Sequence, residues 1–481
     1  MPSKKLITLL RLFSRYELSR FEKYLQSSYF NETKELALIY NLLLDKLIPL
    51  NKENSEDAIL EKQQIWKQVY GTQLPYNDGQ TRRLLSELTQ HALHFLALEH
   101  LDKDPIKEQI ILLDRLKDTN LDLHFSGVLR QAATLQTQSN LHNIDYHFFQ
   151  QQIEDIQHRR IERIGHKIEN LENLENADFH LNSYYITQKL KYYCDALEYG
   201  QSFSMEIEID LFSNFFEWIK NDIYFRQTLI HAYFLIANML LNPQEESFYY
   251  QLRKLLEQKE QNINFLELKA IYIHLVNYCV DKKINVGLVD FFVELFEIFK
   301  SSLDKAIWIE NGYINPQYYK TIITVGLQVK EFAWTETFIQ TYAPKLPPEE
   351  RDNALTYNLA KVYFAQQRYE KVIEQLREVE YENLTYALGG KLMLLKTYYE
   401  LNEYLALDSL IDSFRVYLRR NKLISKEVRQ QYMNILRFIK KLSNVRPGDP
   451  TAVEKIEKQI NECKNLADKG WIVSKVEELK G

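Results

Sequence analysis

The sequence contains few of the residues that interrupt helices. It has 13 glycines and 11 prolines, which is 24 breakers in 481 residues, or about 5%, whereas an average chain carries roughly 12%. Sheets with tight turns depend on these two residues, and long helices do not. We find no convincing alternation of apolar and polar residues that would indicate a β-strand. The shortage of breakers therefore predicts an all-α protein.

Cysteine and long apolar runs are scarce as well. Cys194, Cys279 and Cys463 lie far apart in helical patterns, which is neither disulfide nor metal-ligand spacing and favours a reducing compartment, the cytoplasm. No run of about 18 apolar residues occurs, so no membrane-spanning helix is expected. The first residues, MPSKKLITLLRLFSRYEL, have Arg11 within their apolar run and no small-residue cleavage site. They predict an amphipathic helix and not a signal peptide.

The familiar motifs of catalysis and cofactor binding are missing. The chain has no phosphate-binding loop, no dinucleotide fingerprint, no G-x-S-x-G, no H-E-x-x-H and no C-x-x-C. Gly389-Gly390-Lys391 is a glycine pair at a helix start without the rest of a phosphate loop. We therefore expect no enzymatic activity, no catalytic residue and no cofactor. The net charge of −6 gives the whole chain no nucleic-acid signature.

Two short patterns near residue 90 were tested as sites. Glu87, His91 and His94 share one face of a predicted helix, but zinc needs a fourth ligand and no cysteine is near, so these residues are expected to flank the buried stripe. No metal site is predicted. Arg82 and Arg83 begin the same helix after a turn, as in a helix-turn-helix, although that turn is longer than the usual three or four residues. DNA binding by this region stays open.

Helical periodicity divides the chain into four parts. We predict a helical N-terminal domain over 1–103, long connecting helices over 104–176 with an exposed helix at about 140–173, helix pairs over 177–443, and a linker with capping helices over 444–481. Within the third part the predicted first helices are 177–198, 225–241, 264–280, 315–329, 350–366 and 386–401, and their partners are 206–219, 243–259, 286–300, 332–343, 369–381 and 404–420. A last helix is predicted over 426–442. Helix starts are expected at four Asp-Pro or Asn-Pro pairs, namely 104–105, 242–243, 315–316 and 449–450.

Two stretches repeat one pattern about 35 residues apart. KVYFAQQRYEKVIEQL (361–376) and KTYYELNEYLALDSLI (396–411) share a lysine, a pair of aromatics, a tyrosine and spaced aliphatic residues. Only AQQR separates the two apolar stripes of the first unit, so its helices must pack antiparallel. A two-helix unit with this period resembles the tetratricopeptide repeat. Ala360 fits that pattern, whereas Leu395, Val372 and Leu407 replace its small residues and the closing proline is missing.

This resemblance implies an α-solenoid, a right-handed stack of antiparallel helix pairs that follows the helical N-terminal region. It is clearest over 353–420 and faint over 177–343. The whole chain is also similar to uncharacterised bacterial helical-repeat proteins, which implies a fold and no activity. In such a stack the first helices line a concave face. The resemblance therefore places Lys361 and Lys396 at matching positions on that face, close enough to flank one carboxylate, with Phe364 and Tyr399 about one turn further on.

The segment 414–449 is strongly basic. It holds ten basic residues and two acidic ones, a balance of 10 − 2 = +8 in a chain of net −6. The basic residues are Arg415, Arg419, Arg420, Lys422, Lys426, Arg429, Arg437, Lys440, Lys441 and Arg446. They point away from the apolar stripe of the last helix, so they form either a solvated face or a surface for an acidic partner. The sequence leaves both explanations open.

The function that these patterns favour is a non-enzymatic interaction scaffold. A stack of helix pairs would bind a protein or an acidic peptide through Lys361, Phe364, Lys396 and Tyr399, helped by Arg415, Arg419 and Arg420. The alternative is a nucleic-acid-associated protein that uses the basic face. The partner's identity, the pathway and the oligomeric state cannot be obtained from the sequence.

Overall fold

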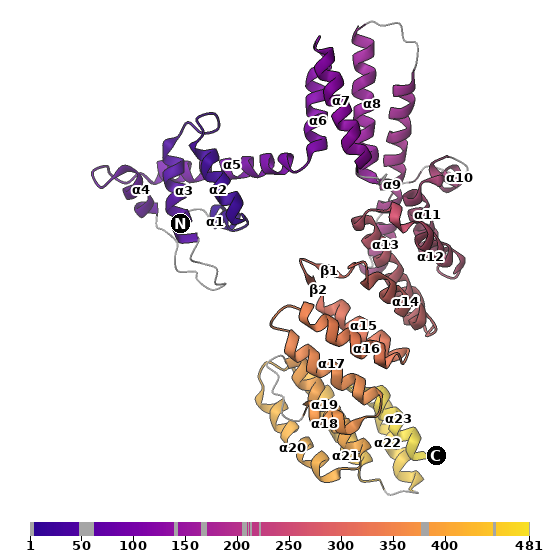
Figure 1. Ribbon diagram of the computed structural model, residues 1–481. Coiled ribbons are helices and arrows are strands. Elements are labelled where there is room, and N and C mark those ends of the chain that lie inside the picture. The colour runs from indigo at the N-terminus through magenta and orange to yellow at the C-terminus, as the bar shows by residue number, and fades with distance from the viewer. Residues whose placement is uncertain are drawn as a thin grey trace. The chain divides into compact units, whose positions relative to one another are not determined.

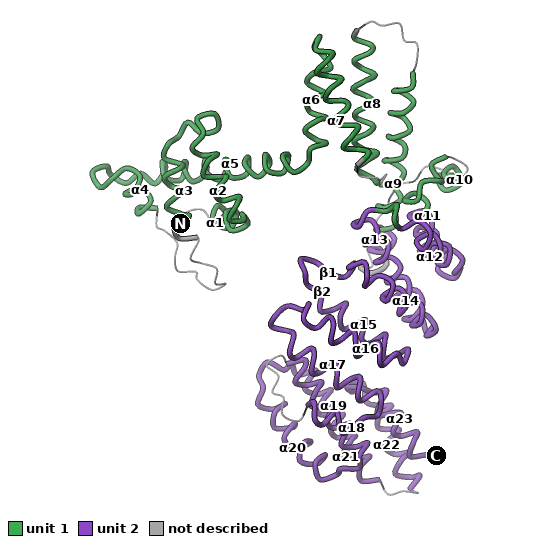
Figure 2. The backbone as a smooth tube through the Cα atoms, in the orientation of Figure 1, with its two compact units in different colours: residues 1–195, 208–231, 261–263 green, residues 196–207, 232–260, 264–481 purple. Residues whose placement is uncertain are grey.

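The protein is all-α, as predicted. Figure 1 shows the computed structural model, which describes residues 4–47, 62–138, 143–164, 171–203, 209, 211, 214–220, 223–376, 384–445 and 449–480. Within these residues the chain forms two compact units, and each is described by itself (Figure 2). Unit 1 comprises residues 1–195, 208–231 and 261–263, and unit 2 comprises residues 196–207, 232–260 and 264–481.

Unit 1 begins with a helical cluster around aromatic residues. Its helices are α1 (Lys4–Leu10), α2 (Arg15–Gln26), α3 (Lys34–Leu47), α4 (Lys62–Tyr70) and α5 (Asp78–Asp102). Ser14 caps α2 because its hydroxyl accepts from the Glu17 amide, while the Glu17 carboxylate accepts from the Ser14 amide. Phe21 is fully buried, and its ring lies 5.2 Å from that of Phe95 in α5. Apolar stripes on α2 and α5 therefore close one core.

A second bundle in unit 1 replaces the exposed connecting helices that we expected. It contains α6 (Pro105–Leu116), α7 (Asp122–Gln138) and α8 (Ile144–Ile164), followed by α9 (Glu172–Phe203, whose residues from 196 belong to unit 2), α10 (Phe215–Lys220) and the 3-10 helix Ile223–Arg226. Ile153 and Ile156 of α8 are buried against Leu113 of α6 and Phe125 of α7. The expectation of an exposed helix was wrong. Polar residues dominate this segment, and the two buried isoleucines, about one helical turn apart, are too few to stand out as an apolar stripe. α9 runs without a break across the predicted domain boundary at residue 176.

Unit 2 contains the helix pairs. Its first elements are α11 (Thr228–Leu241, which begins in unit 1), α12 (Ser247–Lys259), α13 (Phe265–Asn277) with the π-helix Tyr278–Lys283, and α14 (Phe291–Leu303). Then follow α15 (Pro316–Gln328), α16 (Phe332–Tyr342), α17 (Arg351–Ala365), α18 (Tyr369–Leu376), α19 (Leu384–Glu400), α20 (Tyr404–Arg420), α21 (Lys426–Leu442), α22 (Pro450–Glu462) and α23 (Lys469–Lys480). The 3-10 helices are Glu260–Asn262, Ile284–Val286 and Ala343–Lys345. Of the predicted helix 206–219, the structure places a helix only from Phe215, because residues 209, 211 and 214 are not helical and the others before Phe215 lie outside the described residues. Residues 377–381 of the predicted helix 369–381 also lie outside the described residues.

Consecutive helices of unit 2 pack side by side. α15 contacts α16, α17 contacts α18 and α19 contacts α20, while α17 also packs against both α15 and α19. Leu376 in α18 and Ile411 in α20 are buried at matching positions, with exposures of 2% and 1%. The second helices of these two pairs therefore bury equivalent residues of the repeated pattern.

The turns inside these three pairs share one geometry. Lys330, Gln367 and Asn402 all have a positive φ, of 62°, 59° and 58°. In each turn the next amide donates to a carbonyl five residues back, for example Arg368 to Tyr363 at 2.8 Å. This hydrogen bond and the left-handed residue are typical of a Schellman helix end. The backbone therefore repeats every 35 to 37 residues even where the side chains differ.

Two predictions about local structure were wrong. Asn242-Pro243 does not begin a helix, because residues 243–246 form a turn and α12 starts at Ser247. A short antiparallel hairpin, β1 (Ile309–Glu310) with β2 (Tyr313–Ile314), was not expected. Its turn, Asn311-Gly312, has φ values of 51° and 84°. Asn-Gly is the pair that two-residue hairpin turns favour, so the signal was present in the sequence.

Candidate functional site

Four of the predicted partner-binding residues lie together on α17 and α19. Lys361 and Phe364 belong to α17, and Lys396 and Tyr399 to α19. The Lys396 ammonium lies 4.6 Å from the centre of the Phe364 ring, a cation–π distance. Because α17 and α19 pack against each other, residues from two units of the repeat form one surface.

A third lysine, Lys320, joins this surface from α15. Burial lowers the pKa of Lys361, and the neighbouring ammonium groups of Lys320 and Lys396 lower it further. Lys320 lies 5.1 Å from the ring centre of Tyr386 and 4.0 Å from the Glu350 carboxylate. Sequence reasoning did not single out Lys320, although α15 is the first helix of the preceding pair. We call Lys320, Lys361 and Lys396 the lysine row.

Aromatic residues form the floor beside the lysine row. The rings of Tyr357 and Tyr386 meet edge to face at 5.4 Å, and the Tyr386 hydroxyl donates to Glu350 at 3.2 Å. A Cβ added at Gly389 would lie 2.5 Å from the Tyr357 hydroxyl oxygen. Gly389, which we had tested as part of a phosphate loop, therefore has a packing role: it leaves room for Tyr357.

The chain's own C-terminal helix covers one end of the lysine row. The Asp468 carboxylate, at the start of α23, accepts from Lys396 at 2.7 Å. The ring of Trp471 lies 5.4 Å from that of Tyr399, edge to face, and its indole N–H donates to Glu400 at 2.9 Å. Burial raises the pKa of Tyr399 to about 12. The carboxylate that was expected beside Lys396 is thus supplied from within the chain.

Lys361 has a different environment. Its side chain forms no ion pair or hydrogen bond with any other residue that the structure describes, whereas Lys320 and Lys396 each have a carboxylate within 4.0 Å. Three ammonium groups face two carboxylates, Glu350 and Asp468, so the lysine row keeps one unmatched positive charge. A half-buried, unmatched charge favours a ligand that brings a carboxylate.

The predicted arginines lie at the far end of the last repeat. Arg415, Arg419 and Arg420 belong to α20, and Arg415 pairs with Asp412 at 3.2 Å. α19 and α20 are antiparallel, and the 17 residues of α20 span roughly 25 Å. Lys396 lies across from the first turns of α20, and Arg419 and Arg420 are roughly 15 Å further along the axis of that helix, so the two groups form separate surfaces.

Part of the basic segment is used inside the fold. The Arg429 guanidinium donates to the carbonyls of Leu418, Asn421 and Ile424 at 2.8, 3.1 and 3.1 Å. Two lysines of α21 also have partners: Lys440 pairs with Asp408 at 2.5 Å, and Lys441 donates to the side chain of Gln459 in α22. Arg446 lies outside the described residues.

The side chains of Glu87, His91 and His94 in α5 contact other residues of the N-terminal cluster. Glu87 accepts from the Thr33 hydroxyl at 2.9 Å, and the Tyr24 hydroxyl lies 3.2 Å from Nδ1 of His91. The ring of His94 lies 6.2 Å from that of Tyr24. In the described part of the chain, no group of three or more His, Cys, Asp or Glu residues is arranged to hold a metal ion.

The arginines that begin α5 are exposed. Arg82 pairs with Asp78 on its own helix at 2.6 Å. Seven residues, 71–77, separate α4 from α5. In a helix-turn-helix the connection has three or four.

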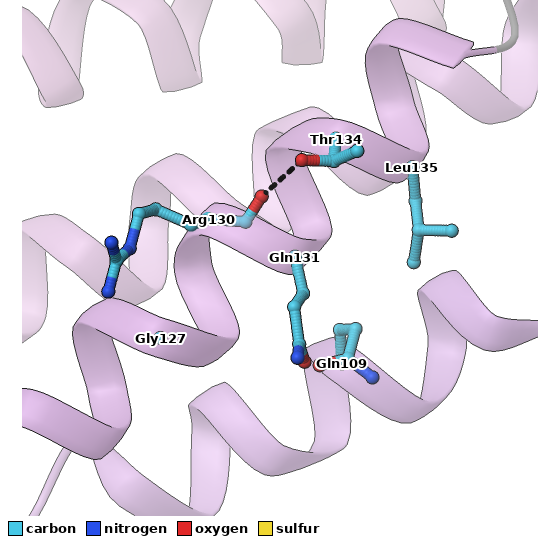
Figure 3. Close-up of a pocket in the computed structure, with 6 residues that line it drawn as sticks. All are labelled: Gln109, Gly127, Arg130, Gln131, Thr134 and Leu135. Carbon is cyan, nitrogen blue, oxygen red and sulfur yellow. Dashed lines mark hydrogen bonds between the residues drawn. The ribbon is translucent and has the colours of Figure 1, made fainter.

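An open hollow lies between α6 and α7 in unit 1 (Figure 3). Figure 3 shows that Gln131 of α7 points toward Gln109 of α6, whose buried Oε1 has no hydrogen-bond partner. The Thr134 hydroxyl donates to the Arg130 carbonyl at 2.8 Å. The lining, Gln109, Gly127, Arg130, Gln131, Thr134 and Leu135, contains neither a nucleophile with an adjacent base nor a carboxylate. We therefore place the candidate site at the lysine row.

Comparisons with known proteins do not extend this description: no family model, no curated protein and no solved structure matches the chain. Among the described residues, no helix has the length and apolar character needed to cross a bilayer.

Proposed function

We propose that the protein is a non-enzymatic scaffold that binds an acidic protein or peptide partner at the lysine row. The observation that carries the proposal is that three consecutive first helices each contribute one lysine to the same surface. A partner carboxylate would pair with Lys361, and the aromatic floor would add apolar contact. The affinity would then come from several modest contacts, as is typical of repeat proteins.

The repeat architecture belongs to this proposal. The three Schellman turns and the contacts of α17 with α15 and α19 support a tetratricopeptide-like solenoid with its first helices on the inner, ligand-binding side. The right-handed stack that the resemblance implies, and a cytoplasmic location based on the scattered free thiols, are parts of the same proposal.

Nucleic-acid binding is the less favoured alternative. Phosphate binding requires several basic side chains that are free to contact a backbone. Here Arg429 donates to carbonyls at the end of α20 and in the turn that follows it, and Arg415 and Lys440 pair with aspartates. Several basic residues of the segment 414–449 are therefore already paired within the fold, and fewer remain for a nucleic-acid backbone.

The test is affinity purification from the native cell extract with the full chain, followed by quantitative mass spectrometry. The variant reverses two lysines, Lys320→Glu with Lys361→Glu, and leaves Lys396 in its pair with Asp468. The matched control, Lys254→Glu with Lys259→Glu, makes the same charge change at exposed positions on α12.

We expect one or more partners to be recovered with the wild type and the control. The lysine-row variant can no longer pair with the partner's carboxylate, and its two new glutamates repel that carboxylate. Together these effects should cost more than about 1.4 kcal/mol, so recovery with this variant should fall at least tenfold. Equal recovery by all three proteins would refute the proposal. Loss of the partner after nuclease treatment, with a steep salt dependence, would favour the nucleic-acid alternative.

A further inference from the structure

The turn between α20 and α21 is held in one conformation by hydrogen bonds and by a buried isoleucine. Ile424 points into the core and is 3% exposed. The Arg429 guanidinium donates to the carbonyls of Asn421 and Ile424 in the turn and of Leu418 in the last turn of α20. The Asn421 side chain accepts from the Leu423 amide at 3.0 Å, and the Ser425 hydroxyl accepts from the Val428 amide at 3.2 Å, which caps α21. The turn therefore presents its outward residues in one fixed arrangement.

Those outward residues combine one aliphatic side chain with four cations. Leu423 is 84% exposed at the turn. Arg419 and Arg420 precede it, Lys422 adjoins it and Lys426 follows. None of these four has a side-chain ion pair or hydrogen bond with a residue that the structure describes. One exposed acid, Glu427, leaves the turn with a balance of 4 − 1 = +3. We call Arg419, Arg420, Lys422, Leu423 and Lys426 the basic tip.

The chemistry of the basic tip matches an anionic lipid surface. Unpaired lysines and arginines are attracted to the anionic headgroups of a bilayer, and an aliphatic side chain gains free energy when it enters the boundary between headgroups and acyl chains. A nucleic-acid backbone offers the same charge but no apolar layer for Leu423. Single-strand binders instead use exposed aromatic rings for stacking. Tyr417, which precedes the tip by two residues in sequence, has Lys391 over its ring at 5.2 Å and accepts from Asn421.

We propose that the basic tip is a peripheral docking site for anionic phospholipid membranes, with Leu423 inserted at the interface and the four cations over the headgroups. This inference goes beyond the proposed scaffold function and does not depend on it, because the tip and the lysine row are separate surfaces. The association would be weak and reversible, since one leucine and a few cations provide far less than a spanning helix.

The experiment is co-sedimentation of the full chain with two kinds of vesicle, phosphatidylcholine alone and phosphatidylcholine with phosphatidylserine at about two to one. The charge variant is Arg419→Glu with Arg420→Glu, and its control is Lys254→Glu with Lys259→Glu on α12. The apolar variant is Leu423→Asp, and its control is Leu405→Asp, which changes an equally exposed leucine (90%) at the opposite end of α20. Fluorescence anisotropy with a duplex and a single-stranded DNA oligonucleotide runs in parallel.

We expect binding to the phosphatidylserine vesicles only, and both controls should bind like the wild type. Each cation near an anionic surface contributes about fivefold in affinity, so the charge variant should bind at least about 25-fold more weakly. Leu423→Asp should weaken binding at least about tenfold, whereas Leu423→Trp should retain or strengthen it. Circular dichroism melts verify that each variant folds.

Three results would overturn the inference. The first is that the wild type does not bind phosphatidylserine vesicles. The second is that Leu423→Asp binds as tightly as Leu405→Asp, which would leave a charge effect without membrane insertion. The third is that the oligonucleotides bind and the vesicles do not, which would assign the tip to nucleic acid.

Discussion

Replacing Gly389 by alanine tests whether the floor of the lysine row is packed as described. In an ordinary helix this change would stabilise the protein by about 0.8–1.0 kcal/mol, because alanine has the higher helix propensity. At Gly389 the new Cβ would lie 2.5 Å from the Tyr357 hydroxyl oxygen and 2.9 Å from two of its ring carbons. Overpacking of this kind typically costs about 1–3 kcal/mol. The net expectation is destabilisation by up to about 2 kcal/mol.

The same glycine replacement in a variant that lacks the Tyr357 ring should change stability in the opposite direction. Tyr357→Leu removes the ring that the new Cβ would meet, so Gly389→Ala should then stabilise the protein by about 0.8–1.0 kcal/mol. Gly127 in α7 is the matched control, because a Cβ there would meet nothing within 4 Å. Gly127→Ala should stabilise its own region by a similar amount.

The assay is urea unfolding of the wild type, Gly389→Ala, Tyr357→Leu, the double variant and Gly127→Ala, with native-state hydrogen exchange to assign each change to α17–α20 or to α6–α8. The reasoning would be refuted if Gly389→Ala stabilised the wild-type background. An equal effect in both backgrounds would also refute it, because the ring of Tyr357 would then not limit the space.

Four further predictions concern stability. Leu376→Ala should cost about 2–5 kcal/mol and should loosen α17–α20 before the N-terminal cluster, which hydrogen exchange would detect as early opening. Gln367→Gly should stabilise by up to about 1 kcal/mol in urea unfolding, because glycine adopts the left-handed conformation without the strain of a side chain; a loss of stability would contradict the Schellman geometry. The capping amide and hydroxyl lower the pKa of Glu17 to about 2. The contribution of Glu17 to the free energy of unfolding is therefore fully present above the unfolded pKa of about 4.3 and is lost as the pH falls through about 2. The melting temperatures of the wild type and Glu17→Gln should converge over this window. Lys475→Met should cost about 1.5–3 kcal/mol because it removes the cation that Glu400 accepts from at 2.8 Å. Adding Glu400→Gln, which removes the charge and still accepts from the Trp471 indole N–H, should restore part of that loss; no recovery would mean that the pair is not desolvated.

The sequence was sufficient for the helices because their signals are local. Apolar stripes with the helical period placed α11 to α21, and three of the four Asp-Pro or Asn-Pro pairs begin helices where expected. The Asn242-Pro243 pair failed because a turn and a first helical turn accept the same two residues. The hairpin at Asn311-Gly312 was missed because its strands have only two residues each, too few to show alternation.

Only part of the candidate site could be predicted from the sequence. Equal repeat positions brought Lys361 and Lys396 together, since a repeated helix pair places equivalent residues side by side. Lys320 was missed because the preceding unit has a different length, so its register could not be aligned. Arg419 and Arg420 were predicted to help at the same partner surface, but they lie roughly 15 Å from Lys396 along the axis of α20.

Helix positions and the succession of antiparallel pairs were thus determined by residues a few positions apart, through propensity, capping and periodicity. The burial of Lys396 by α23 was decided by tertiary structure. Asp468 reaches Lys396 across 72 residues, and Trp471 reaches Glu400 across 71. Nothing local encodes those contacts, because the place of α23 depends on how α20, α21 and α22 pack in turn. The exposed Leu423 beside a buried Ile424 has the same origin: both are aliphatic residues in one turn, and only the packed core determines which of them faces water.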